Sequence, residues 1–179
     1  MKAGVANVIL GALRQGPKSG YDIKQLVDNA TRFFWAASYG QLYPELRRLV
    51  ADGQIEGTSR PRGGRQRTEY RLTPTGRDAL RTWLREPAAG WEVRDEGLLK
   101  LFFAGALEGD DALGVVRAFR ADREGVLRQL RDVQRREAKE AEGFPGLALE
   151  YGIGLHEWIV GWCLEIEERL SRQLEVAAR

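Results

Sequence analysis

One short segment of the sequence concentrates side chains that can contact a charged polymer. Residues 37–56 read ASYGQLYPELRRLVADGQIE. Leu42, Leu46 and Leu49 recur three or four positions apart, which predicts a helix with one buried side. The other side then carries the polar residues of the segment, namely Ser38, Tyr39, Gln41, Tyr43, Arg47 and Arg48. Phenol, carboxamide and guanidinium groups hydrogen bond to phosphates and base edges, so this side is a candidate surface for reading nucleic acid.

Each of these groups has its own chemical use. Gln41 can pair bidentately with adenine, an arginine can fork onto guanine, and tyrosine hydroxyls reach phosphates. Ser38 and Gln41 together match a capping box, which predicts that the helix starts at Ser38. The free amides of that first turn suit a phosphate oxygen. The alternative is an ordinary solvated helix, and the neighbouring elements decide between the two.

The elements around this helix follow a defined order. Apolar spacing predicts one helix from Val5 to Leu13 and another that is capped by Ser19. After the polar-faced helix, residues 54–59 and 67–72 have the composition of two strands that flank a Gly-Gly turn, and a fourth helix begins at Thr73. Three helices, a β-hairpin and a fourth helix predict a winged helix-turn-helix. In that fold the third helix enters the major groove and the hairpin, called the wing, touches the DNA backbone or minor groove.

The predicted wing is rich in arginine. Five arginines fall within twelve residues around the glycine turn, namely Arg60, Arg62, Arg65, Arg67 and Arg71. A solvated charged surface explains such a run taken alone. Beside a polar-faced third helix, it favours contact with nucleic acid. We therefore expect Arg62, Arg65 and Arg67 to contact the duplex, with Arg65 and Arg67 on phosphates.

The distribution of charge divides the chain into two parts. Residues 1–86 hold 15 Lys and Arg against 8 Asp and Glu, a balance of +7, whereas residues 87–179 hold 13 against 18, a balance of −5. The segment REPAAGWE at residues 85–92 breaks any helix. We therefore predict a basic winged-helix domain at residues 1–86 and an acidic domain at residues 87–179.

The second domain is predicted to be entirely helical, with a short helix capped by Asp95 followed by two longer ones. Over residues 110–142 a heptad seam is predicted at Ala112, Val116, Phe119, Arg123, Val126, Leu130, Val133 and Glu137. The last helix has one apolar stripe at Leu149, Ile153, His156, Val160, Cys163, Leu170 and Leu174. It has a second stripe at Leu155, Ile159, Trp162 and Ile166. A helix that is apolar on two sides needs two neighbours, so we infer a homodimer whose interface includes these helices.

Three residues of the last helix are candidates for binding a small molecule. Trp158 and Trp162 stand one turn apart and could line a pocket for a flat apolar effector, although core packing is the ordinary role of tryptophan. His156 is the only histidine. It is either a hydrogen-bonded core residue or a switch that responds to protonation or ligand.

Several classes of protein are excluded by the sequence. The single cysteine excludes an intrachain disulfide and agrees with a reducing compartment. Without a convincing signal peptide or membrane span, we expect a cytoplasmic protein. The sequence lacks an HExxH motif, a nucleophile elbow, an intact phosphate loop and a cysteine pair, so we expect no enzyme, no cofactor and no metal.

Several motifs together resemble the PadR family of bacterial transcriptional regulators. They are GPKSGYDI, the aromatic FFW linker, SYGQLYPELRRL and YRLTPTGR, and they fall within residues 8–84. The resemblance implies a homodimeric winged-helix regulator, usually a repressor, that binds a pseudo-palindromic operator and in some members releases it when a small molecule binds. It also implies that Ser38, Tyr39, Gln41, Tyr43 and Arg47 contact DNA. The alternative is a winged-helix module that binds proteins through its aromatic residues and never binds DNA.

Overall fold

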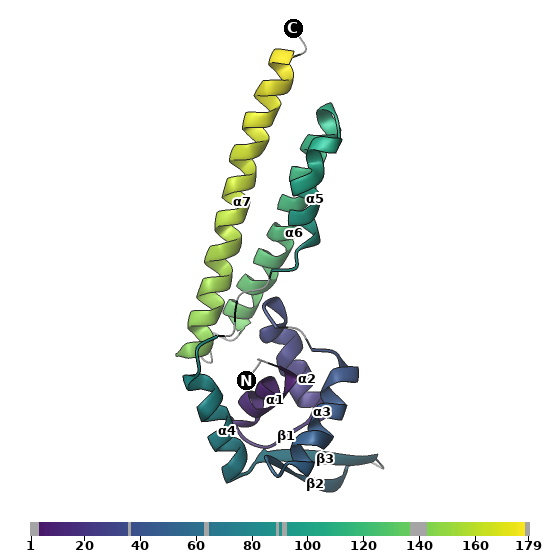
Figure 1. Ribbon diagram of the computed structural model, residues 1–179, viewed down its shortest axis with the longest axis vertical. Coiled ribbons are helices and arrows are strands. Elements are labelled where there is room, and N and C mark those ends of the chain that lie inside the picture. Colours follow the sequence, from purple (N-terminus) through teal and green to yellow (C-terminus); the bar gives the residue numbers. More distant parts are fainter. Residues whose placement is uncertain are drawn as a thin grey trace. The chain divides into compact units, whose positions relative to one another are not determined.

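The structure is a computed structural model that describes residues 4–35, 37–62, 65–88, 90, 93–136 and 143–177. The chain divides into two compact units, Met1–Glu92 and Val93–Arg179 (Figure 1). Each unit has its own cluster of buried apolar side chains. The domain boundary that the sequence predicts, after residue 86, directly follows the last helix of the first unit and remains a proposal.

The first unit has the element order of a winged helix-turn-helix. Its elements are α1 (Val5–Leu13), β1 (Lys18–Ser19), α2 (Gly20–Asn29), the 3-10 helix η1 (Thr31–Phe33), α3 (Tyr39–Ala51), β2 (Ile55–Arg62), β3 (Arg65–Leu72) and α4 (Pro74–Arg85). The starts of α2 and α4 follow from local sequence. The Ser19 side chain accepts a hydrogen bond from the Asp22 amide, and the Thr73 side chain accepts one from the Gly76 amide. The predicted fold class is confirmed.

The sheet contains one strand that the sequence did not predict. Its order is β1-β3-β2, all antiparallel, with Ser19 of β1 opposite Glu69 of β3. β1 has only two residues and forms because β3 offers it a partner. The hairpin is also longer than predicted, since pairing continues to Arg62 opposite Arg65. Pro61 is tolerated because β2 is an edge strand, where a missing amide donor leaves no neighbour unpaired.

The core of the first unit lies between its helices and the root of the hairpin. It includes Ile9, Leu10, Ile23, Leu42, Leu46, Leu49 and Ile55, all at most 2% exposed. Pro44 lies within α3 and removes one amide donor, yet the helix is continuous from Tyr39. The proline faces solvent, and so does Gly40, whose carbonyl would have accepted that hydrogen bond.

The second unit is a long helical hairpin with a short helix against it. Its elements are α5 (Glu96–Phe103), the 3-10 helix η2 (Ala104–Ala106), α6 (Gly109–Arg136) and α7 (Phe144–Ala177). Asp95 caps α5 as predicted, accepting from the Leu98 amide at 3.1 Å. Figure 1 shows α6 and α7 side by side and antiparallel.

The predicted seam of α6 is partly wrong. The buried side chains are Leu113, Val116, Phe119, Leu127 and Leu130. Leu113 and Leu127 were not predicted, whereas Val126 is half-buried. Arg123, a charged position of that seam, lies over the Phe119 ring at 4.8 Å and binds Asp95 at 2.8 Å. Glu137 lies outside the described residues.

Among the described helices, none combines the length and the apolar composition that crossing a lipid bilayer requires. Likewise, no three His, Cys, Asp or Glu side chains in the described ranges are grouped so that they could hold a metal ion.

Candidate nucleic-acid interface

The two sides of α3 differ sharply in exposure. Leu42, Leu46 and Leu49 are completely buried, whereas Tyr39 and Tyr43 are 45% and 42% exposed. Ser38, Gln41, Arg47 and Arg48 are exposed as well. All six residues that the sequence singled out on this helix therefore lie on its solvent side.

The start of α3 is capped by the side chain of Gln41. Its Oε1 accepts hydrogen bonds from the Ser38 amide at 3.1 Å and from Ser38 Oγ at 3.3 Å. A carbonyl oxygen has two lone pairs, so both are used. Gln41 can still donate from Nε2, but bidentate pairing with adenine would require it to leave the cap.

The two tyrosines of α3 are held by α2. Their rings stack at 6.1 Å with an interplanar angle of 16°. The Lys24 ammonium lies 5.2 Å from the centre of the Tyr39 ring. A Cβ added to Gly20 would lie 3.0 Å from the Tyr43 ring, so glycine allows that ring to approach α2 closely. Sequence reasoning missed these roles of Gly20 and Lys24, since contacts between two helices leave no local pattern.

The polar side of α3 and the root of the wing share one surface. Burial raises the pKa of Tyr70 in β3, the neighbouring Tyr43 raises it further, and the positive charge of Arg47 acts in the opposite direction. Tyr70 also packs against the buried cluster that contains Leu42 and Leu46 of α3, so the root of the wing and α3 are joined through one core.

The arginines of this surface are not equivalent. Arg48 pairs with Glu45 at 2.6 Å and also with Asp52, both on its own helix or its end. Arg71 pairs with Glu56 across the hairpin at 2.6 Å. Arg67 reaches out of the wing to Asp22 of α2. The structure describes only the backbone of Arg62 and Arg65, and their side chains lie outside the described part.

The structure brings together two of the three candidate effector residues of α7, and the third, His156, lies apart from them. Trp158 and Trp162 stack at 6.5 Å, and Trp158 is 66% exposed. His156 is buried and lies on another side of the helix, roughly 160° away from Trp158 at about 100° per residue. Cys163 is fully buried, and burial raises the pKa of its thiol, which agrees with a packing role.

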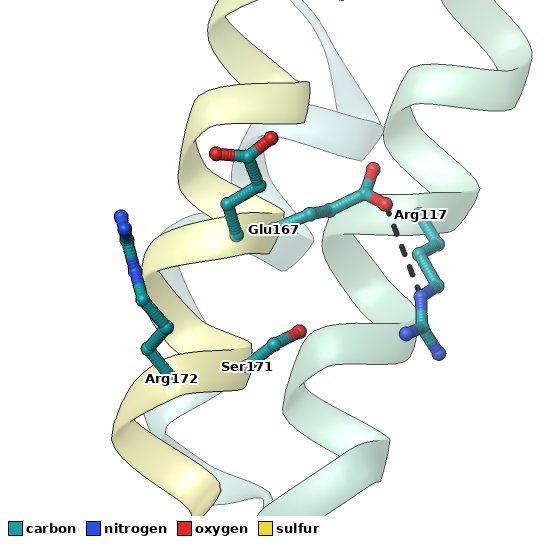
Figure 2. Close-up of a pocket in the computed structure, with 5 residues that line it drawn as sticks. Arg117, Glu167, Ser171 and Arg172 are labelled. Atoms are coloured by element: carbon teal, nitrogen blue, oxygen red, sulfur yellow. Dashed lines mark ion pairs between the residues drawn. The ribbon is translucent and has the colours of Figure 1, made fainter.

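An open depression of about 450 Å³ lies elsewhere on α6 and α7, and Figure 2 shows the side chains that line it. It is lined by Arg117, Glu167, Glu168, Ser171 and Arg172. Arg117 Nε lies 3.9 Å from Glu167 Oε2, the pair that the dashed line marks. Charged groups of both signs line this depression, so it does not resemble a site for a flat apolar molecule.

Known proteins match both units. Residues 9–82 match the family described as Transcriptional regulator PadR-like family, and residues 93–171 match Virulence activator alpha C-term. The negative transcriptional regulator PadR of Bacillus subtilis strain 168 is 30% identical over 169 residues, which cover 93% of this chain and 91% of that protein.

Solved structures also show similarity to Bacillus subtilis PadR. The crystal structure of Bacillus subtilis PadR in complex with operator DNA has a TM-score of 0.83 and 28% identity, covering 92% of this chain and 97% of that chain. The structure of Bacillus subtilis PadR in complex with p-coumaric acid has a TM-score of 0.75 and 28% identity, and the match covers 93% of this chain and 98% of that chain.

Fold and sequence together define a winged helix-turn-helix transcriptional regulator. More narrowly, the chain belongs to the PadR-like transcriptional regulator family. The resemblance found in the sequence is therefore confirmed. Because the members of this family are regulators of transcription, the chain is not an enzyme.

The environment of His156 predicts a dependence of stability on pH. Burial lowers the pKa of this imidazole, the charge of Arg123 lowers it further, and Asp122 and Asp95 act in the opposite direction. The unfolded chain, with a histidine pKa near 6.5, binds the proton more readily than the folded chain. Stability should therefore be highest above that pH and fall as the pH drops toward the lower pKa of the folded chain.

In urea titrations at pH 7.5 and 5.5, wild type should lose more stability between the two pH values than His156→Gln. Parallel losses in the two proteins would contradict this assignment.

Proposed function

We propose that this PadR-type regulator is a homodimeric repressor that binds a pseudo-palindromic operator through α3 and the wing. The similar Bacillus subtilis protein is named a negative transcriptional regulator, and one solved structure of that protein contains operator DNA. A protein with this role acts where the DNA is, so we also propose a cytoplasmic location.

One observation carries the proposal. The root of the wing packs on the same buried cluster as α3, through Ile55 of β2 and Tyr70 of β3, so the two elements form one body that can meet a duplex together. A protein that exposed only one of them would have half of the interface that a winged helix uses.

The contacts that we propose follow from exposure on α3 and from position beside the turn on the wing. On α3 they are Ser38, Tyr39, Gln41, Tyr43, Arg47 and Arg48, with Gln41 donating from Nε2 to a base acceptor. On the wing they are Arg62 and Arg65, which flank the turn. The α3 side chains would read bases from the major groove, and the wing arginines would hold the phosphates.

The comparisons give no support to the alternative, a winged-helix module that binds only proteins. The relatives reported above are transcriptional regulators. Salt-insensitive binding to a protein partner, without retention on DNA, would revive it.

Arg47 provides the direct test of DNA binding. Arg47→Ala should weaken binding to the DNA upstream of the protein's own gene by about 1 to 3 kcal/mol, because one guanidinium contact is lost. The measurement is a shift assay at several salt concentrations, repeated with a scrambled duplex. Arg81→Ala is the matched control, since Arg81 is an exposed arginine of α4 that pairs only weakly with Asp78 at 3.5 Å. Equal losses in the two variants, or wild type that retains neither duplex, would refute the proposed interface.

The proposed homodimer is supported by apolar side chains that face solvent in the second unit. Phe102 and Phe103 of α5 are 80% and 63% exposed. On α7 the exposed apolar residues recur at steps of three and four, at Phe144, Leu147, Tyr151 and Leu155. Exposed apolar surface of this extent marks a site of association.

This stripe is not one of those predicted from the sequence. Of the second predicted stripe of α7, Ile159, Trp162 and Ile166 pack against the buried residues Val116, Phe119 and Cys163 within the chain. The exposed line lies nearer the start of the helix. A second copy is the occupant that we propose for it, because a twofold axis would cover the same surface in both chains.

A charge placed on this surface should separate the dimer. Phe102→Asp should give monomers in sedimentation equilibrium with unchanged helix content, because the side chain is already exposed within a single chain. The control is Gln134→Asp, which adds the same charge at an exposed position of α6 outside the apolar stripe. A Phe102→Asp protein that sediments like wild type would contradict the interface.

We further propose that a flat apolar effector binds against the tryptophan pair of α7. Bacillus subtilis PadR has been solved with p-coumaric acid, which contains an aromatic ring. Trp158 offers an exposed ring that is already stacked on Trp162. His156 does not lie beside these rings, so we leave it out of the proposed site.

p-Coumaric acid is a suitable probe for this site. In titration calorimetry, Trp158→Ala should bind it about 2- to 10-fold more weakly than wild type, because the binding free energy of one aromatic contact is lost. Trp35→Ala, in the first unit, should bind it like wild type. Equal affinity in wild type and Trp158→Ala would place any effector elsewhere.

A further inference from the structure

We propose that Asp22 and Arg67 form a clamp that fixes the wing to α2, so that Arg67 is a positioning residue for DNA binding. This inference rests on the proposed function. It assigns to Arg67 a different role from the phosphate contact that the sequence suggested.

The geometry of the pair ties two distant parts of the first unit together. Arg67 Nη2 donates to Asp22 Oδ1 at 2.6 Å and also to Asp22 Oδ2, and the two residues are 45 positions apart in the sequence. Arg67 lies within β3, opposite Arg60 of β2. Asp22 lies in the first turn of α2. The bond therefore joins the hairpin directly to the helix-turn-helix.

Both ends of the clamp are held in place. The Ser19 amide and Ser19 Oγ each donate to Asp22 Oδ2 at 2.8 Å. Ser19 itself is paired with Glu69 of β3. On the other side, Arg67 Nε is covered by protein and has no hydrogen-bond partner in the described part of the chain. The guanidinium is therefore partly covered by protein on the same edge that binds Asp22.

The clamp also acts on the recognition helix. Asp22 lies two residues after Gly20, where an added Cβ would be 3.0 Å from the Tyr43 ring. It precedes Lys24, whose ammonium lies over the Tyr39 ring. The first turns of α2 thus contact β3 and both tyrosines of α3. A change in the angle of the wing would therefore move the wing relative to these two rings.

Electrostatics favours this role over a phosphate contact. Burial raises the pKa of Asp22, but hydrogen bonds from Arg67 and Ser19 outweigh it, so the pKa is lowered and the carboxylate stays ionised at neutral pH. If Arg67 turned to a phosphate, the Asp22 carboxylate would lose its positively charged partner and would stand beside a polyanion. The two roles therefore predict opposite effects for removing the charge of Asp22.

The test uses the full chain and fluorescence anisotropy with the upstream DNA at several salt concentrations. For a clamp, Arg67→Ala and Asp22→Asn each weaken binding on the order of 5-fold, and the double variant is no weaker than either single one. The salt dependence keeps the wild-type slope in all three. Arg65→Ala is the comparison, since a lost phosphate contact reduces the slope by about one unit. Ser19→Ala controls for the helix cap, because it removes that hydroxyl and leaves the ion pair; it should weaken binding less than Asp22→Asn.

Two results would overturn the clamp. One is tighter DNA binding by Asp22→Asn, and the other is a reduced salt slope in Arg67→Ala that matches Arg65→Ala. If the wild type binds no duplex, the proposed function fails. Amide hydrogen exchange measured without DNA still decides whether the clamp fixes the wing. Faster exchange of β2 and β3 amides in both single variants supports it, and wild-type exchange rates in both refute it.

Discussion

One-sided burial of α3 is the constraint on which the rest of the first unit depends. Leu42, Leu46 and Leu49 are fully buried, and each stabilises the fold by about 1.5 to 3 kcal/mol. Rotating the helix about its axis would expose all three, so its polar side is fixed toward solvent by residues that never touch a ligand. The polar positions are consequently free to change without loss of the fold. A family built on this arrangement can alter the sequence that it reads while keeping one scaffold.

The burial of leucines fixes which side faces out, but it does not fix the fine angle of the reading surface. That angle depends on the beginning of α2. Gly20, Asp22 and Lys24 alternate along its first turns and contact Tyr43, Arg67 and Tyr39 respectively. Ile23, which lies among them, is fully buried and anchors the helix to the core. A segment of five residues therefore contacts both α3 and the wing, and we expect a substitution there to alter the DNA contacts that we propose for other residues.

The features that could be predicted from the sequence are those that depend on residues close together along the chain. The caps at Ser19, Thr73 and Asp95, the leucine side of α3 and the hairpin each follow from residues within one or two turns of each other. The features that were missed depend on partners far along the chain. β1 exists because β3 pairs with it, and the ion pair of Asp22 joins it to Arg67, which is 45 residues away. On α6 the seam predicted from the sequence did not include Leu113 and Leu127, which are buried along the length of the helix that packs with α7.

The helical hairpin of the second unit has a register that charge fixes more firmly than shape. Arg120 of α6 binds Glu124 of the same helix and Glu167 of α7, each at 2.6 Å, and Glu167 is only 14% exposed. Sliding α7 by one turn, about 5.4 Å, would break the bond between Arg120 and Glu167, and a partly buried pair costs more to break than a surface pair. An apolar seam alone would tolerate such a slide better, because one leucine can replace another. In the proposed dimer, two recognition helices must stand about 34 Å apart to meet successive turns of one face of DNA. A hairpin whose register cannot drift is the kind of element that can hold such a spacing constant.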